Sequence, residues 1–157
     1  MTDASLTPPT RPRVKMKPKS NARAIRHGFP WVYANELVID RRTKKLAPGS
    51  LAVLEDEAGR SLGLVAVNPE SKIIARMLDR NPEAQIDVAW CAARLSRAQE
   101  LRTQLYDVPF YRLVHAEADG LPGVVIDRFG DTCVMQPNAA WAEAHLEALA
   151  QALGEVT

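Results

Sequence analysis

Short apolar runs alternate with turn-forming residues along the first half of the chain, at intervals of about ten residues. Residues 14–17 alternate apolar and charged side chains, which predicts an edge strand. A short helix is expected over 21–26, capped by Ser20 and ended by Gly28 and Pro30. Further strands, separated by turns, are expected at 36–40, 51–55, 61–67 and 72–78. This spacing is typical of a small closed β-barrel.

The apolar pattern changes to a helical period after this region. Asp87 is positioned to cap a helix, with its solvated face at Arg94, Arg97 and Glu100 and a buried stripe at Cys91, Leu95, Ala98, Leu101 and Leu105. Three strands are expected at 111–115, 123–127 and 132–136. A last helix is expected from Trp141 to Leu153, capped by Asn138 and ended by Gly154, with Ala142, Leu146, Leu149 and Leu153 buried.

These elements predict an α+β protein in several parts. Residues 1–13, rich in proline and threonine, are expected to be a disordered tail in which Arg11 and Arg13 are solvated. The barrel is expected over 14–83, a linking helix over 84–106 and the start of a second, incomplete α+β domain over 107–157.

The composition, 46% hydrophobic and 25% charged, is that of a globular protein. No apolar run approaches the roughly 20 residues of a membrane helix, and no secretory signal is present at the N-terminus. Cys91 and Cys133 lie far apart with no metal-ligand spacing, which favours buried thiols in a reducing cytosol. We therefore expect a cytoplasmic protein with no membrane association.

The net charge of +1 conceals a strong asymmetry. Residues 11–45 contain eleven Lys or Arg against Glu36 and Asp40, a net +9, whereas residues 46–157 carry a net −7. Such an asymmetry is expected of a surface that binds a polyanion on an otherwise acidic protein. The stretch from Arg23 to Lys45 also contains apolar residues, which indicates a folded basic surface.

Residues 117–131, EADGLPGVVIDRFGD, concentrate four carboxylates and three glycines. Carboxylates that converge in a cleft could act as general acids or bases, but Asp-Gly, Pro-Gly and Gly-Asp are turn dipeptides. The stretch lacks the ligand spacing of a calcium loop, and the chain has no GxGxxG, P-loop, HExxH or GxSxG motif. We interpret these carboxylates as caps and turn partners, with no catalytic residue and no metal site.

Two stretches together resemble a known family. RHGFPWVY at 26–33, with the barrel pattern that follows it, resembles the PUA domain of the class I S-adenosylmethionine-dependent ribosomal RNA large-subunit methyltransferase I family. YRLVHAEADGLPGVVIDRFGD at 111–131 resembles the central region of the same family. The resemblance implies an RNA-binding barrel that positions ribosomal RNA for formation of 5-methylcytosine in 23S rRNA, in the cytoplasm.

Two departures from that family limit what the resemblance implies. A Gly-Phe pair precedes Pro30 where family members usually continue from Arg-His directly to Pro-Trp. The Rossmann-like domain that carries the family's cofactor-binding glycines and catalytic cysteine has no counterpart, and neither Cys91 nor Cys133 matches the nucleophile motif. S-adenosylmethionine is therefore expected in the full-length family, and neither cofactor binding nor catalysis is expected from this chain alone.

The resemblance and the charge asymmetry together predict RNA contacts from one basic face. Lys and Arg would neutralise phosphates, and an aromatic ring could stack on an unpaired base. The alternative for Trp31 is a residue of the barrel core, and the alternative for His27 is a local hydrogen-bond partner. The alternative interpretation of the whole chain is a stand-alone PUA-type RNA-binding module or a protein-interaction module, in either case without catalysis. A homodimer is the other partner that we consider. The candidate RNA-binding residues are Lys19, Arg23, Arg26, His27, Trp31, Arg41, Arg42, Lys44 and Lys45.

Overall fold

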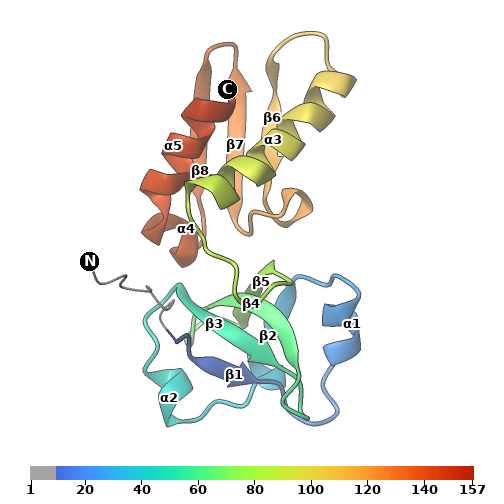
Figure 1. The fold of residues 1–157 in the computed structure, drawn as a ribbon, viewed down its shortest axis with the longest axis vertical. Helices are drawn as coiled ribbons and strands as arrows, with labels where there is room; N and C mark the ends of the chain where they lie inside the picture. Colours follow the sequence, from blue (N-terminus) through green and yellow to red (C-terminus); the bar gives the residue numbers. More distant parts are fainter. Residues whose placement is uncertain (1–9) are drawn as a thin grey trace, which may run out of the picture.

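A computed structural model describes residues 10–157, which form two parts joined by an extended segment (Figure 1). The predicted tail thus lies largely outside the described residues. Within them, Arg11 donates to the carbonyl of Pro82 over 3.0 Å and Arg13 lies 3.5 Å from the carboxylate of Glu55. Arg11, predicted to be solvated, is therefore held by the segment that contains Pro82, whereas the Arg13 side chain stays largely exposed beside Glu55.

The first part is a five-stranded sheet in the order β1-β3-β4-β5-β2. Its strands are β1 (Arg13–Lys15), β2 (Trp31–Tyr33), β3 (Ser50–Glu55), β4 (Ser61–Val67) and β5 (Ile73–Asp79). All neighbouring pairs are antiparallel except β1 and β3. A bridge between Met16 and Leu37 brings the two edges of the sheet together. The curled sheet encloses a core that includes both of these side chains, as the alternating pattern predicted.

Three short helical segments lie between the strands of this barrel: α1 (Ala22–Arg26), the 3₁₀ turn η1 (Ala34–Glu36) and α2 (Arg41–Lys44). Asn21, rather than the predicted Ser20, caps α1 by accepting from the backbone N–H of Ala24. The strand predicted at 36–40 is wrong. There Glu36 ends the 3₁₀ turn, and pairing with the β1 edge is limited to the Leu37–Met16 bridge and its two flanking hydrogen bonds, because Asp40 already caps α2.

The second part packs its helices on one face of an antiparallel sheet in the order β6-β7-β8 (Figure 1). The sheet consists of β6 (Phe110–His115), β7 (Val124–Phe129) and β8 (Thr132–Pro137), with the 3₁₀ turn η2 (Ala116–Asp119) after β6. The helices are α3 (Val88–Leu105), the short α4 (Ala140–Ala144) and α5 (Leu146–Val156). The whole described chain is α+β, as predicted.

The predicted helix cap in this part is confirmed for α3, whereas the cap predicted at Asn138 for the last helix is wrong. The carboxylate of Asp87 accepts from the backbone N–H of Trp90 and caps α3. Residues 141–153, expected to be one helix, are interrupted at His145, and no side chain caps α4. Gly154 lies inside α5 instead of ending it.

Side chains from α3, α4 and α5 form the core of the second part. Trp90 and Trp141 meet edge to face with centroids 6.0 Å apart, beside Leu95 and Leu149. Leu101, Leu105 and Leu146, which the helical stripes placed inside, are exposed. Within residues 10–157 no helix is both long and apolar enough to cross a bilayer.

Candidate nucleic-acid interface

Three aromatic side chains follow one another at alternate positions where α1 leads into β2. Gly28, at φ +102°, turns the chain after α1, and β2 then places Trp31 and Tyr33 on the same face of the strand. Phe29 lies beside both, with its ring centroid 6.3 Å from that of Trp31 and 6.4 Å from that of Tyr33. Phe29 and Tyr33 are each 40% exposed, so their faces are open to a planar ligand.

These rings line a hollow of about 530 Å³ beside α1, which we call the aromatic hollow. Lys17 and Lys19 stand on its rim, and Lys19 holds a left-handed backbone at φ +65°. Among the described residues neither ammonium group has a hydrogen-bond or ion-pair partner. Open aromatic faces flanked by free cations are what an unstacked base and its phosphates require.

The Trp31 side chain is partly buried, and its indole N–H is hydrogen-bonded. Its indole Nε1–H donates to Glu117 Oε1 over 3.1 Å, across the junction between the barrel and the second part. The same carboxylate accepts from Arg76 Nη1 over 2.7 Å. The guanidinium of Arg76 lies 5.8 Å from the Trp31 ring centroid, a cation–π arrangement. Trp31 therefore forms the wall of the hollow, and its orientation is set by the second part.

The basic residues predicted on α1 have different surroundings. Arg26 is ion-paired with Asp56, a carboxylate whose side chain is only 3% exposed and which also accepts from Arg60 over 3.0 Å. Burial opposes ionisation of Asp56, but the backbone N–H of Arg60 and its charge outweigh it, so the pKa of Asp56 is lowered. Arg26 is thus held by the fold, whereas Arg23 and His27 are exposed at the end of α1.

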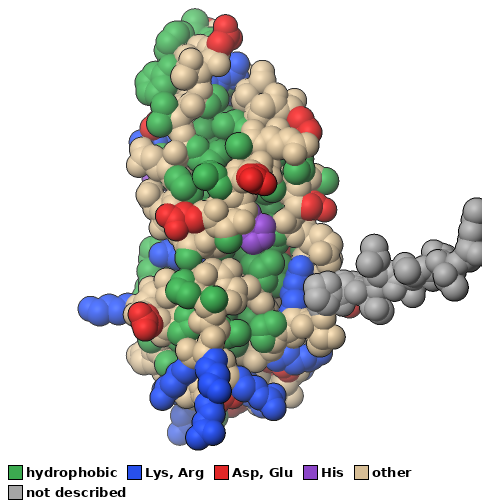
Figure 2. Space-filling model, turned by 90° about the vertical axis from the view of Figure 1, so that its left-hand side faces the viewer, with side chains coloured by type: hydrophobic (Ala, Val, Ile, Leu, Met, Phe, Trp, Pro, Cys, Tyr) green, Lys and Arg blue, Asp and Glu red, His purple; other side chains and the backbone are tan. Residues whose placement is uncertain are grey.

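The remaining predicted cations lie elsewhere on the barrel. The sequence placed them in a loop, but Asp40 caps a short helix there, and hydrogen bonds from Thr43 lower the pKa of its carboxyl group. Lys and Arg side chains gather at the end of the barrel where this helix lies (Figure 2). Figure 1 shows α1 and α2 on opposite sides of the barrel. The exposed α2 cluster consists of Arg41, Arg42, Lys44 and Lys45.

The predicted single basic face is therefore two surfaces. Lys19 and Trp31 come together in the aromatic hollow, and the α2 cluster forms a separate patch. The sequence reasoning missed Lys17, Phe29 and Tyr33. Aromatic residues at 29, 31 and 33 are spaced by two, as expected for one face of an extended strand, and that signal could have identified the hollow.

The carboxylates of the acidic stretch 117–131 were predicted to be caps and turn partners, but three of them form ion pairs with arginines. Glu117 pairs with Arg76, and Asp127 pairs with Arg112 over 2.9 Å. Asp119 accepts two hydrogen bonds from Arg102, at 2.7 and 2.8 Å, and one from the backbone N–H of His115. These carboxylates point to different partners, and no group of three potential metal ligands occurs within residues 10–157.

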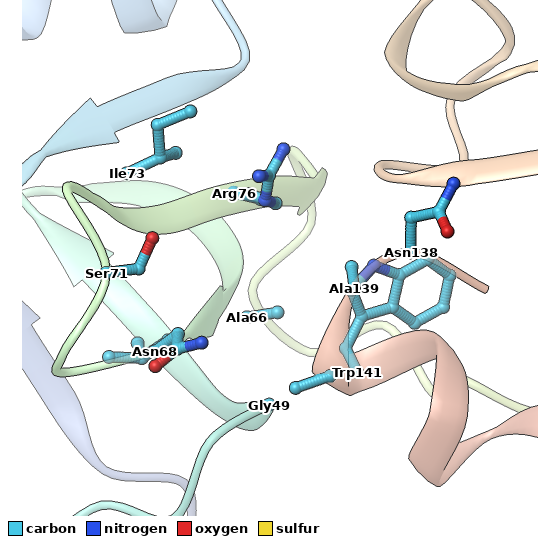
Figure 3. A pocket seen from close by; sticks show the side chains of 11 residues that line it. Gly49, Ala66, Asn68, Ser71, Ile73, Arg76, Asn138, Ala139 and Trp141 are labelled. Atoms are coloured by element: carbon cyan, nitrogen blue, oxygen red, sulfur yellow. The ribbon is translucent and has the colours of Figure 1, made fainter.

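The junction of the two parts contains a small cavity of about 180 Å³ (Figure 3). Gly49, at φ +85°, brings the loop before β3 against α4, where an added Cβ would lie 2.8 Å from the backbone of Ala140. Figure 3 shows Arg76 from β5 facing Asn138 and Trp141 from the second part. The junction is thus closely packed here, and its shape depends on a residue without a side chain.

Comparisons with known proteins agree with this architecture. Residues 14–80 match the family model described as a PUA-like domain. The chain is 38% identical over 138 residues to the ribosomal RNA large subunit methyltransferase I of Cronobacter sakazakii, covering 86% of this chain and 34% of that protein. It is 36% identical over 139 residues to a ribosomal RNA large subunit methyltransferase of Deinococcus radiodurans, covering 83% and 34%.

The fold is also found among solved structures. A Streptococcus mutans protein assigned to the SAM-dependent methyltransferases superposes with a TM-score of 0.77 at 14% identity, covering 92% of this chain and 38% of that chain. An assigned methyltransferase in complex with SAH superposes with a TM-score of 0.73 at 16% identity, covering 92% and 37%. At these identities the likeness shows the fold alone.

The barrel is therefore a PUA-like domain joined to an α+β domain. The chain belongs to the family of ribosomal RNA large subunit methyltransferase I proteins, as the motifs at 26–33 and 111–131 indicated. It spans about a third of the length of the curated relatives that it matches.

Proposed function

We propose that this chain is the RNA-binding portion of a methyltransferase that modifies ribosomal RNA of the large subunit. The observation that carries the proposal is the aromatic hollow, which is lined by the exposed rings of Phe29 and Tyr33 together with Lys17 and Lys19, whose ammonium groups have no partner among the described residues. Bases displaced from a folded RNA would stack on the rings, and the lysines would bind the adjoining phosphates. The family relationship supports ribosomal RNA as the partner, because relatives named for that activity match most of the chain.

Trp31, Lys19 and the α1 residues Arg23 and His27 would contribute to this surface. Arg26 would contribute less, because its guanidinium is already paired with Asp56. The α2 cluster would bind phosphates on a second side of a folded RNA. Such contacts add affinity without base selection, since they recognise only the backbone charge.

In the longer protein the RNA would be presented to a catalytic domain that transfers a methyl group from S-adenosylmethionine to carbon 5 of a cytosine in 23S rRNA, in the cytoplasm. The described residues do not fit that cofactor. Their β–α connections lack a glycine-rich loop between a parallel strand and a helix, and both sheets are antiparallel apart from the β1–β3 pair.

Binding of the 157-residue chain to a structured rRNA fragment, titrated at several salt concentrations, tests the proposal. We expect affinity to fall steeply with salt, and replacing Phe29 and Tyr33 by Ala to weaken binding about tenfold or more, because each stacked base contributes roughly 1–3 kcal/mol. Replacing Lys17 and Lys19 by Ala should reduce the salt dependence. Arg112→Ala, on the second sheet, is the control and should bind as the parent chain does. A flat salt response, or full affinity after the aromatic substitutions, would contradict the proposal.

The α2 cluster is tested separately, by replacing Arg41, Arg42, Lys44 and Lys45 with Ala. We expect weaker binding to the folded fragment with little change in preference between sequences, because these side chains would contact phosphates. Unchanged affinity would remove α2 from the interface and leave the aromatic hollow as the RNA site.

A second candidate function rests on the outer face of the second sheet. Phe110 and Phe129 are cross-strand partners, 62% and 55% exposed, and Val134 on β8 is 48% exposed. An apolar group of this kind is typical of a surface that another protein chain covers. We propose self-association through this face, as a homodimer, as the alternative. Sedimentation at increasing concentration should show a dimer that Phe110→Ser weakens, and a strictly monomeric chain without RNA affinity would contradict both candidates.

A further inference from the structure

A second hollow, of about 500 Å³, adjoins the aromatic hollow and shares Phe29 and Ile25 with it. We call it the junction hollow, because it lies between the barrel and the second part. The barrel contributes Gly28 and Arg80, and helix α3 contributes Arg97. The Phe29 ring therefore forms a wall common to both hollows, and a ligand on that ring can extend into either.

The acidic side chains that line the junction hollow are occupied by the protein itself. Asp79 accepts from Trp90 Nε1 over 3.0 Å and from Arg94 over 3.4 Å. Burial opposes its ionisation, but these hydrogen bonds and that of the Asn81 backbone outweigh it, so the pKa of Asp79 is lowered. Glu117 is held by Arg76 and by the Trp31 indole. Neither carboxylate is left to compete for the cations at the rim.

The one acidic side chain in the aromatic hollow is occupied in the same way. The carboxylate of Glu36 accepts from the backbone N–H of Tyr33 over 3.1 Å and from that of Asn21 over 3.3 Å. These bonds fix it to the turn between α1 and β2. Its charge is thereby directed to backbone donors and away from the lysine side chains.

Arg94 is held by Asp79 and by two backbone carbonyls, but within residues 10–157 the other cations that line the two hollows are free. Arg80 and Arg97 are exposed and, within residues 10–157, neither guanidinium has a hydrogen-bond or ion-pair partner. An atom added at Gly28 would lie 3.6 Å from Arg80 Nη2, so this guanidinium lies next to the turn that carries Phe29. Lys17 and Lys19 add free charge in the aromatic hollow, which Phe29 also lines. Paired acids and unpaired bases give both hollows a positive excess.

We propose that the two hollows form one track for single-stranded RNA, which crosses the Phe29 ring from Lys17 and Lys19 on the barrel to Arg80 and Arg97 at helix α3. The inference rests on the proposed function, and it extends the RNA site from the PUA-like domain onto the second part. Successive bases stack on Tyr33 and Phe29, and the backbone continues past Arg80 toward Arg97. A duplex cannot bind in this way, since its bases are stacked on one another and do not reach the ring.

Fluorescence anisotropy with the 157-residue chain and labelled oligouridylates of about four and about ten nucleotides, lengths typical of single-strand sites, tests the track. The shorter probe fills the aromatic hollow alone, and the longer one reaches the junction. We expect the double substitution Arg80→Ala and Arg97→Ala to weaken the longer probe on the order of tenfold. The shorter probe should bind within about twofold of its parent affinity, because it makes no contact with either arginine.

The salt dependence gives an independent measurement. Loss of two phosphate contacts should lower the slope of log affinity against log salt by roughly 1.4 for the longer probe. Arg80→Lys with Arg97→Lys keeps the charges and should restore the slope. Arg112→Ala removes a positive charge from the second sheet and should leave both probes unchanged.

The outcomes separate this inference from the proposed function. If Lys17→Ala with Lys19→Ala weakens both probes while the arginine pair has no effect, RNA ends at the barrel and the track is wrong, although RNA binding stands. If neither pair affects either probe, both proposals are wrong. Tight binding of an acidic peptide that the RNA fails to displace would assign the hollows to a protein partner and would also overturn the track.

Discussion

Trp31 and Glu117, 86 positions apart in sequence, are joined by a hydrogen bond of 3.1 Å between the indole Nε1 and the carboxylate Oε1. One residue belongs to β2 of the barrel and the other to the turn after β6. Since Arg76 shares the carboxylate, a side chain of the aromatic hollow is oriented from the second part. The hollow is therefore a property of the two parts together.

Substituting Glu117 should weaken both the orientation of Trp31 and the contact between the two parts of the chain. Glu117→Ala leaves a half-buried guanidinium and an indole N–H without an acceptor, and we expect a loss of about 1–3 kcal/mol in the free energy of unfolding. Glu117→Gln retains an acceptor for Trp31 and should cost less, about 1 kcal/mol. Urea unfolding measures both, and Asp131→Asn, an exposed carboxylate of the same motif, is the control, expected within about 0.5 kcal/mol of the parent. Equal losses of unfolding free energy for Glu117→Ala, Glu117→Gln and Asp131→Asn would mean that the hydrogen bond between Trp31 and Glu117 does not contribute to stability.

Gly49 should tolerate no side chain. Its φ of +85° is strained for other residues, and an added Cβ would lie 2.8 Å from the Ala140 backbone. We expect Gly49→Ala to destabilise the chain by about 1–3 kcal/mol. Gly154 is a matched control, because it lies inside α5 with nothing within 4 Å of an added Cβ. Gly154→Ala should stabilise by about 0.5–1 kcal/mol, through helix propensity. Thermal unfolding tests this pair: we expect the Tm to fall for Gly49→Ala and to rise for Gly154→Ala. Shifts of both variants in the same direction would contradict the prediction.

The fold could be predicted where a segment with the apolar pattern of a strand is also paired with neighbouring strands. Residues 61–67 are an apolar run bounded by turns and are paired on both sides, so pattern and structure agree. Residues 36–40 are also rich in apolar side chains, but their pairing with β1 is a single bridge before Asp40 starts α2, and Val38 and Ile39 are exposed. At the C-terminus the break at His145 changes the phase of the helix and leaves Leu146 outside. Composition does not indicate such a break.

The candidate site could be predicted only in part. Charge counting identified Lys19 and the α2 cluster, but it could not show that α1 and α2 lie on opposite sides of the barrel. Arg94 was expected on a solvated helix face. Its guanidinium instead lies 3.7 Å from the Trp90 ring centroid and donates to the carbonyls of Leu78 and Gly120. Backbone acceptors distant in sequence carry no signal in the residue types, so tertiary contacts of this kind stay hidden.

The two cysteines should differ in reactivity. Burial raises the pKa of the Cys91 thiol to about 11, whereas Cys133 is only partly buried and its pKa is raised, also by burial. Because thiolate is the reacting form, Cys91 should stay inert to a disulfide reagent at pH 8 until the chain unfolds. Cys133→Ser should therefore leave a native protein with almost no reactive thiol, and denaturant should expose one. Rapid native labelling of the Cys133→Ser variant would contradict the buried position of Cys91.

Stability should fall in acid through the carboxylates that the fold keeps ionised. The pKa of Asp79 is lowered because hydrogen bonds from the Asn81 backbone and Trp90, with the charge of Arg94, outweigh the effect of burial. A carboxyl group with a lowered pKa stabilises the fold fully above its unfolded pKa of about 3.9, and that stability is lost as pH falls through the folded value.

The unfolding free energy, measured by urea titration from neutral pH to about pH 3, should therefore decline mainly below about pH 4.5. Asp79→Asn keeps an acceptor but not the charge, so it should be less stable at neutral pH and should lose less on acidification. The difference between the two proteins should shrink as Asp79 is protonated in the parent. Asp131→Asn serves as the control and should follow the parent curve. Parallel curves for the parent and Asp79→Asn would show that this carboxylate is not a source of the acid sensitivity.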